Sequence, residues 1–357
     1  MLILTSIKTG SGHKSSANAI EKKLRDQGYD CKQLDVFPLM GFMGNLMENS
    51  YITLTTRAPL LYYVCEKFSQ LFPDIVHFAM YNRVKEAMLR EIKDYDPDLI
   101  ISVQCMFTKA ISKLLRNSGI HIPFYIGVID LVEPPKVWID PQADMSFVPT
   151  DTVRNDYIAH GFPEDRVLTS GFPVRDDIVV LDKAKTINNR VHILMVNTST
   201  NLDKNITFLK EVSRLEKVSI KFICGLDERL HRTLTSMKEE GKLSQDIDIY
   251  SFVDNMNEFL EHAHIILTKA GPNVITEAVR SDTAVVITGH IKGQENHNYQ
   301  FITDNGYGFK CEDPDQIYEK LNEFIKTDGL KKCLDTIVRH DISNGAEYIA
   351  NYVKEHI

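Results

Sequence analysis

Short apolar runs alternate with segments of helical spacing along the whole chain, and this alternation limits the possible folds more than any other feature. Gly, Pro, Asp or other turn formers bound the runs, as expected for buried strands. In the first helical segment, over about 14–27, Ala17, Ile20 and Leu24 share one face. Strands that alternate with helices favour an α/β fold built on parallel sheets. The predicted strands are Leu2–Ser6, Gln33–Phe37, Asp98–Val103, Phe124–Ile129, Met145–Val148, Val191–Val196, Ser219–Cys224, Asp248–Phe252, Ile265–Thr268 and Ala284–Ile287.

These strands fall into two series, which indicates two domains. The polar stretch 182–190 separates them, so a linker is expected near 176–190. A chain of 357 residues also suits two domains of about 100–200 residues each. We therefore predict doubly wound, Rossmann-like domains over 1–180 and 188–340. The last segment, 341–357, has helical spacing and is expected to pack back on the N-terminal domain.

The composition excludes several classes of protein. With 43% hydrophobic and 25% charged residues, the chain is neither a disordered nor a collagen-like sequence. A formal net charge of −8 argues against a nucleic-acid-binding protein with a broad basic surface. The excess of acids lies in the second half, because residues 1–150 contain 16 Lys and Arg and 16 Asp and Glu. The two halves could therefore meet different partners, although ordinary variation between solvated surfaces explains the difference equally well.

The cysteines and the N-terminal residues indicate the cellular compartment in which the protein is expected to function. Six cysteines are scattered without a CxxC pair, which is typical of reduced cytosolic thiols and not of a disulfide framework or a zinc site. Residues 2–6 resemble a strand and not a signal peptide, because no basic region precedes them and no cleavage site follows. No apolar stretch approaches the length of a membrane-spanning helix, about 20 residues. The one close His pair, His262 and His264, is expected to be structural, so no metal site is predicted.

Residues 42–93 interrupt the alternation with many large aromatic and apolar side chains. A long insertion between strands is often functional. Within 57–93, six Lys and Arg accompany four acids, so this segment could lie against a membrane surface or cover a lipid-like substrate. The alternative is a pair of helices that completes the N-terminal core, and the sequence favours neither.

The first loop, residues 9–13, has the sequence Thr-Gly-Ser-Gly-His. Its glycines allow a ligand to approach the backbone, and the following helix N-terminus attracts negative charge. His13 is therefore a candidate general base near neutral pH. A dinucleotide-binding alternative takes the two glycines as the start of a GxGxxG motif and Asp35 as the acid after the next strand. Its third glycine is replaced by Ser15, and it leaves the histidine without a role.

In the second half, residues 269–273 (Lys-Ala-Gly-Pro-Asn) follow a buried strand and lead into a helix over 274–280. The N-terminus of that helix can face a pyrophosphate. Glu277 lies four residues after Asn273, so the two side chains share one face of the helix. A carboxylate at this place can accept hydrogen bonds from ribose hydroxyls. The alternative is an acid that merely stabilises the first turn of the helix.

The next strand is followed by 289–298, which contains Gln294, Glu295 and Asn298 near the start of a helix. Amides and a carboxylate in this arrangement suit hydrogen bonding to a polyol, although the same residues could cap the helix. Open α/β sheets bind ligands at the carboxyl ends of neighbouring strands. Two polar loops after successive strands therefore favour a binding site here.

These motifs carry a family resemblance. The Gly-Ser-Gly-His start, 269–277 and 293–298 are similar to the glycosyltransferases of glycolipid synthesis in family 28. That family includes monogalactosyldiacylglycerol synthase and the processive diacylglycerol glucosyltransferases, which are relatives of the peptidoglycan N-acetylglucosaminyltransferase. Residues 127–130 (Gly-Val-Ile-Asp), 136–138 (Lys-Val-Trp) and 170–175 (Ser-Gly-Phe-Pro-Val-Arg) resemble the middle region of the family in order and spacing. The resemblance covers nearly the whole chain.

The resemblance implies a GT-B fold, in which two Rossmann-like domains face each other across a cleft. The N-terminal domain would bind a diacylglycerol-type lipid as acceptor, and the C-terminal domain would bind a UDP-sugar. His13 would be the catalytic base, with Asp130 as its rival or helper. Trp138, Tyr62 and Tyr63 would lie near the acceptor. The implied donor-binding residues are Gly12, Phe252, Val253, Lys269, Gly271, Pro272, Asn273, Glu277, Gln294, Glu295 and Asn298.

The implied reaction is an inverting single displacement that needs no metal or other cofactor. It would take place in the cytoplasm, with the protein peripherally associated with the inner face of the cell membrane. The chain departs from the family in two donor loops: 269–273 lacks the usual pair of glycines, and 197–201 (Asn-Thr-Ser-Thr-Asn) has no glycine where a Gly-rich turn is usual. One alternative is therefore a catalytically weak sensor that binds UDP-sugar or lipid. The other is a nicotinamide-dependent oxidoreductase built on Gly10, Gly12 and Asp35.

Overall fold

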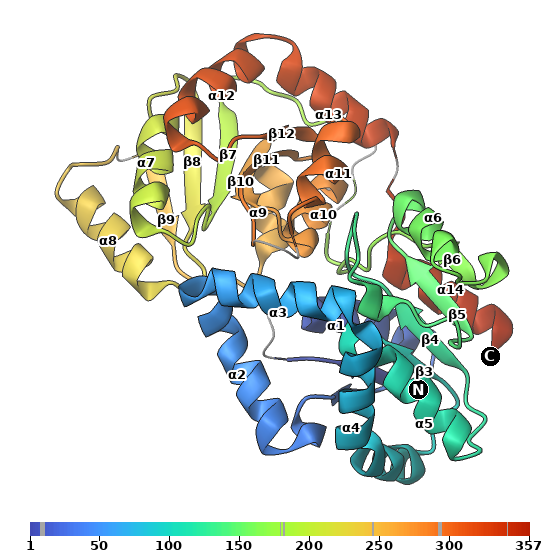
Figure 1. The fold of residues 1–357 in the computed structure, drawn as a ribbon. Helices are drawn as coiled ribbons and strands as arrows, with labels where there is room; N and C mark the ends of the chain where they lie inside the picture. The colour runs from blue at the N-terminus through green and yellow to red at the C-terminus, as the bar shows by residue number, and fades with distance from the viewer. Residues whose placement is uncertain (8–10, 179, 181–182, 245, 292–294, 341) are drawn as a thin grey trace. The chain divides into compact units, whose positions relative to one another are not determined.

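The computed structural model describes residues 1–7, 11–178, 180, 183–244, 246–291, 295–340 and 342–357. These residues form two compact units (Figure 1). The N-terminal unit contains Met1–Arg175 and Ser343–Ile357, and the C-terminal unit contains Asp176–Ile291 and Glu295–Ile342. Each unit has a parallel sheet of six strands, flanked by helices, which confirms the predicted α/β class.

The N-terminal sheet consists of β1 (Leu2–Thr5), β2 (Lys32–Asp35), β3 (Ile100–Ser102), β4 (Phe124–Gly127), β5 (Met145–Val148) and β6 (Val167–Thr169). Their order is β2-β1-β3-β4-β5-β6, so the direction of winding reverses between β1 and β3. These two strands pair directly, with Leu2 opposite Ile100. Ligands bind to such sheets at the carboxyl ends of the strands, beside the reversal. His13, in the first turn of α1, and the residues after β3 lie at this place.

Helices cover both faces of the N-terminal sheet (Figure 1). They are α1 (Ser11–Asp26), α2 (Phe42–Arg57), α3 (Pro59–Leu71), α4 (Pro73–Tyr95), α5 (Thr108–Asn117), α6 (Asp151–Ala159) and α14 (Gly345–His356), with 3₁₀ turns η1 (Pro38–Met40), η2 (Cys105–Phe107), η3 (Lys136–Trp138) and η4 (Glu164–Arg166). The C-terminal helix α14 packs against α1. Its Tyr352 ring lies 5.2 Å from the Phe147 ring and 5.9 Å from the Tyr125 ring, so the end of the chain is part of the N-terminal core.

The insertion over 42–93 forms α2, α3 and α4, and each of the two interpretations describes part of it. Helix α4 buries one face and packs against α5, so it completes the N-terminal core. Other parts of the segment expose large apolar side chains, which we call the apolar face: Phe42, Met43, Leu46, Leu60, Leu61, Val64, Phe68, Leu71, Phe72, Ile75 and Phe78. None of the described helices has the length and hydropathy of a membrane-spanning segment.

The C-terminal sheet consists of β7 (Val191–Val196), β8 (Val218–Ile223), β9 (Ile247–Tyr250), β10 (Ile265–Lys269), β11 (Ala284–Gly289) and β12 (Gly308–Lys310). Their order is β12-β11-β10-β7-β8-β9, so the winding reverses between β7 and β10. The helices are α7 (Leu202–Val212), α8 (Glu228–Glu239), α9 (Met256–His262), α10 (Pro272–Arg280), α11 (Asn298–Asp304), α12 (Ile317–Lys326) and α13 (Gly329–Arg339), with the 3₁₀ turn η5 (Pro314–Gln316). The loops after β7, β10 and β11 therefore gather at one edge of the sheet, beside the reversal.

Most predicted strands are present with small shifts of their ends, and β5 and β7 have the predicted bounds. Two strands, β6 and β12, were not predicted. Each has three residues and lies at the edge of its sheet. A segment this short has too few residues to show a hydrophobic period.

Candidate active site

His13 lies in the first turn of α1, directly after β1. Its Nδ1 is 2.6 Å from the carbonyl oxygen of Val103, which follows β3. Because a carbonyl only accepts, Nδ1 carries the proton and donates, and Nε2 keeps its lone pair. Burial lowers the pKa of His13, and the hydrogen bond to Val103 opposes this shift. The imidazole is therefore neutral at pH 7, with a basic nitrogen at the reversal of the N-terminal sheet.

Asp130 lies three residues beyond β4, the strand beside β3. Its carboxylate is buried, and Oδ2 accepts a hydrogen bond from Nε1 of Trp138 at 2.6 Å. Trp138, which is predicted to lie near the acceptor, has a fully buried side chain. The observed geometry therefore makes Trp138 a residue that orients Asp130.

The other N-terminal candidates lie on α1 and α3. Gly12 is half-buried in the first turn of α1, beside His13. Tyr62 and Tyr63 are half-buried on α3, which contacts the η3 turn that carries Trp138. The ammonium group of Lys67 lies 5.6 Å from the Tyr63 ring. The two tyrosines thus lie among the exposed side chains of the apolar face.

In the C-terminal unit, the loop after β10 leads into α10 with Gly271 as N-cap and Pro272 as its first residue. No side chain caps this helix. The N–H groups of its first turn, Asn273 included, therefore point out of the helix and attract anions. Lys269 precedes the turn, and burial lowers the pKa of its ammonium group while Glu295 and Asp227 oppose the shift. Glu277 is buried one turn further along α10.

Glu295 and Asn298 join the loop after β11 to the loop after β10. Glu295 Oε2 accepts a hydrogen bond from the Ile291 N–H at 2.7 Å, and its Oε1 lies 3.8 Å from the position that a Cβ on Gly271 would occupy. Asn298 Nδ2 donates to the Ala270 carbonyl at 2.9 Å. Burial raises the pKa of Glu295, while the Ile291 N–H and Lys269 oppose the shift. The structure thus brings these predicted donor residues together.

Two predicted donor residues stand apart from this group. Phe252 is exposed and Val253 is half-buried just after β9, the edge strand that β7 and β8 separate from β10. Gln294 lies outside the described residues.

Sequence reasoning missed a second set of residues at this edge. His290 Nδ1 lies 2.6 Å from Glu312 Oε1, and the Lys310 ammonium lies 3.2 Å from the same oxygen. Burial acts to raise the pKa of Glu312, but the hydrogen bonds from His290 and Lys310 hold it below its ordinary value. Thr288 and Asn205 hold the loop after β7, as described below. The His290–Glu312 and Thr288–Thr198 contacts join residues distant in sequence, so no local motif predicts them.

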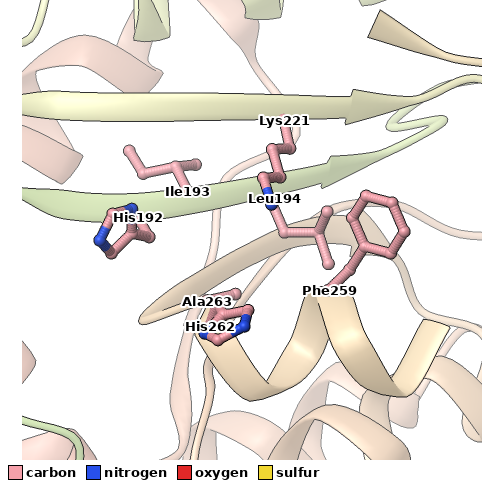
Figure 2. Close-up of a pocket in the computed structure, with 7 residues that line it drawn as sticks. All are labelled: His192, Ile193, Leu194, Lys221, Phe259, His262 and Ala263. Atoms are coloured by element: carbon pink, nitrogen blue, oxygen red, sulfur yellow. The ribbon is translucent and has the colours of Figure 1, made fainter. Parts of the chain in front are cut away.

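A pocket of about 230 Å³ lies elsewhere in the C-terminal unit, between β7, β8 and α9 (Figure 2). His192, Lys221 and His262 line it together with apolar residues. His192 is the second residue of β7, so the pocket lies near the amino end of the strand, away from the donor loops. Beside it, His264 Nδ1 accepts a hydrogen bond from the His192 N–H at 3.0 Å. Among the described residues, no group of three or more His, Cys, Asp or Glu side chains could hold a metal ion.

Each of the two units matches a model of a known protein family. Residues 13–174 match the family model of monogalactosyldiacylglycerol (MGDG) synthase, and residues 196–346 match the glycosyltransferase family 28 C-terminal domain. A processive diacylglycerol beta-glucosyltransferase of Bacillus cereus (strain G9842) is 24% identical over 92% of this chain and 86% of its own length. The corresponding protein of Bacillus mycoides (strain KBAB4) is 23% identical over 95% of this chain and 90% of its own length.

Solved structures show the same fold. MurG of Acinetobacter baumannii superposes with a TM-score of 0.68 at 15% identity, covering 99% of both chains. The spinosyn rhamnosyltransferase SpnG, in complex with thymidine diphosphate, has a TM-score of 0.67 at 11% identity and covers 99% of this chain and 100% of its own. The predicted GT-B type is thus confirmed. The chain belongs to glycosyltransferase family 28, with an N-terminal domain of the MGDG synthase type, and is related to the diacylglycerol glucosyltransferases.

Proposed function

We propose that the protein is an inverting hexosyltransferase that moves a sugar from a UDP-sugar to the hydroxyl group of a diacylglycerol-type lipid. The observation that carries the proposal is the geometry of His13, whose Nδ1 donates to Val103 while Nε2 keeps its lone pair. A neutral imidazole held in one orientation is suited to accept the proton of an attacking hydroxyl group. Family membership supports the transfer of a sugar as the reaction.

In the proposed reaction, Nε2 of His13 removes the proton of the acceptor hydroxyl as its oxygen attacks the anomeric carbon. The bond from that carbon to the UDP oxygen breaks in the same step, so the configuration inverts. The departing diphosphate gains negative charge, which the first-turn N–H groups of α10 and the Lys269 ammonium stabilise. Asp130, oriented by Trp138, remains the second candidate for the base.

The donor would bind along the carboxyl edge of the C-terminal sheet. Glu277 would accept hydrogen bonds from the ribose, and Glu295 with Gln294 would contact the hexose. Glu295 suits this role because its Oε1 lies beside Gly271, in the turn that leads into α10. No metal or other cofactor is required in this scheme, because helix N–H groups and a lysine can carry the charge of the leaving group.

The lipid acceptor would reach the protein through the apolar face of α2, α3 and α4. Among the side chains that the structure describes, eleven large apolar ones are exposed there, of which Phe42 is 82% and Leu60 is 75% exposed. Exposed apolar area of this kind marks a membrane or partner surface. Cations accompany it: the Lys113 ammonium lies 4.7 Å from the Tyr81 ring, beside Phe78. We therefore propose peripheral binding to the inner face of the cell membrane from the cytoplasm.

Two variants test the proposal. His13→Ala should abolish sugar transfer to diacylglycerol in lipid vesicles while UDP binding persists, because the base does not hold the nucleotide. Glu277→Ala should weaken UDP binding, because it removes the ribose acceptor. Transfer at the wild-type rate by both variants would contradict the assignment.

A second candidate function is a catalytically weak sensor of UDP-sugar or lipid, which the glycine-free turn 197–201 favours. Such a protein would bind UDP and vesicles but form no product. Measurable transfer of sugar to diacylglycerol by the purified protein would rule it out.

A further inference from the structure

The loop after β7 adopts a conformation that usually requires glycine. Asn197, its first residue, has a φ of 34°, in the left-handed region. Asparagine is among the few residues other than glycine that adopt this region readily. Its backbone N–H donates to the Ile223 carbonyl at 2.9 Å, and its Nδ2 donates to the Cys224 carbonyl at 3.3 Å. The absence of glycine from 197–201 therefore does not prevent the chain from turning.

Asn205, in the first turn of α7, anchors this loop through hydrogen bonds of its side chain. It is 1% exposed, and its side chain hydrogen-bonds to two loop residues at close range. Oδ1 accepts from the Thr198 hydroxyl at 2.8 Å and from the Ser199 N–H at 2.9 Å, and Nδ2 donates to the Ser199 carbonyl at 2.7 Å. Nδ2 also lies 3.5 Å from Asn197 Oδ1. One buried amide thus fixes both the backbone and the side chains of the loop.

Thr288 ties the same loop to the neighbouring strands. Its buried hydroxyl lies 2.8 Å from the Thr198 carbonyl and 3.1 Å from the Thr268 carbonyl, and donates its proton to this pair. Thr268 lies in β10 and Thr288 in β11. The loop after β7 is thereby joined to the two strands whose following loops contain Gly271 and Glu295.

We infer that Asn205 is a positioning residue that presets the 197–201 loop for the diphosphate of the nucleotide. The inference rests on the proposed function, since it needs the donor to bind at this edge. Ser199 and Thr200 carry hydroxyl groups that can donate to phosphate oxygens, and α7 begins directly after the loop with Asn201 as its N-cap. A loop already held in its bound conformation binds a ligand more tightly, because less conformational entropy is lost on binding.

The test compares Asn205→Ala with Val212→Ala. Both replace a buried side chain of α7, but Val212 lies two turns away and its apolar side chain cannot hydrogen-bond to the loop. UDP affinity is measured by calorimetry, and KM for the UDP-sugar and kcat are measured with diacylglycerol vesicles. Asn205→Ala should weaken UDP binding and raise KM at least tenfold, with a smaller change in kcat. Val212→Ala should leave the UDP affinity within twofold of wild type.

A second pair of variants keeps the inference testable if Asn205→Ala fails to fold. Asn197→Gly accepts the positive φ but loses the side-chain contacts with Cys224 and Asn205, so it should bind UDP more weakly than wild type and more tightly than Asn197→Ala. Asn197→Ala should bind several-fold more weakly, because alanine is strained there. Equal UDP affinity in wild type, Asn205→Ala and Asn197→Ala would overturn the inference and leave the proposed function intact. If wild type itself does not bind UDP, the proposed function fails first.

Discussion

Asn344 anchors the C-terminal helix α14 within the N-terminal unit. The loss in free energy of unfolding when alanine replaces it can be estimated from three hydrogen bonds. Its Oδ1 accepts from the N–H groups of Val174 and Ala346 at 3.1 and 3.0 Å, and its Nδ2 donates to the Val174 carbonyl at 2.9 Å. The substitution removes the partner of both the N–H and the carbonyl group of Val174. Because Val174 is buried, water does not readily replace that partner. At about 1 kcal/mol per hydrogen bond, and more for a buried group left unpaired, Asn344→Ala should lower the free energy of unfolding by about 3 kcal/mol.

The fluorescence of Trp138 measures this loss in the N-terminal unit alone. It is the only tryptophan of the chain and is fully buried in that unit, so its emission changes when the unit unfolds. In a urea titration, a loss of this size lowers the unfolding midpoint by roughly 1–3 M, because the dependence on urea is about 1–3 kcal/mol per molar.

Asn351→Ala is the matched control on the same helix. Asn351 is exposed, and its Oδ1 accepts one hydrogen bond from Gln27 Nε2 at 3.0 Å. An exposed contact of this kind contributes about 0.5 kcal/mol or less. If Asn344→Ala and Asn351→Ala destabilise the unit equally, the reasoning that α14 is anchored through Asn344 is refuted.

Three further predictions concern the site. Because burial lowers the pKa of His13, the neutral base persists to pH values below 6.5, and kcat/KM should fall on the acid side with a midpoint below 6.5; a midpoint at or above 6.5 would contradict this role. Replacing the exposed Leu71 and Phe78 by serine should weaken binding to diacylglycerol-containing vesicles about tenfold in flotation assays, whereas serine at the exposed Leu226 of the C-terminal unit should not. UDP should raise the melting temperature and NAD should not; protection by NAD alone would favour the oxidoreductase alternative.

Much of the fold could be predicted because parallel strands buried on both faces leave a clear apolar signal. Val191–Val196 and Met145–Val148 are such strands, and their predicted bounds agree with β7 and β5. The strand at Gly308–Lys310 gave no such signal, since it is short and half-buried at the edge of its sheet. The segment 42–93 was undecided because aromatic side chains suit both a core and a lipid surface, and its helices use them for both.

The candidate site was predicted where the residues form a local pattern and missed where the contacts are distant in sequence. The turn into α10 follows from a strand, a glycine and a proline in succession. The burial of Trp138 against Asp130 does not follow from spacing, because tryptophan occurs both in cores and at acceptor surfaces. The role of Asn205 depends on the loop it meets and on Thr288, 83 positions further along the chain, so only the three-dimensional structure reveals it.

The most direct test of the central claim is to incubate the purified protein with vesicles that contain diacylglycerol, supply UDP-glucose and UDP-galactose separately, and analyse the lipids by mass spectrometry and NMR. The account predicts a hexosyl-diacylglycerol with inverted, β configuration at the anomeric carbon, and no product from His13→Ala. Retention of the α configuration would contradict the single displacement. The absence of any hexosyl-lipid, from protein that binds both UDP and the vesicles, would contradict the assignment as a glycolipid-forming transferase.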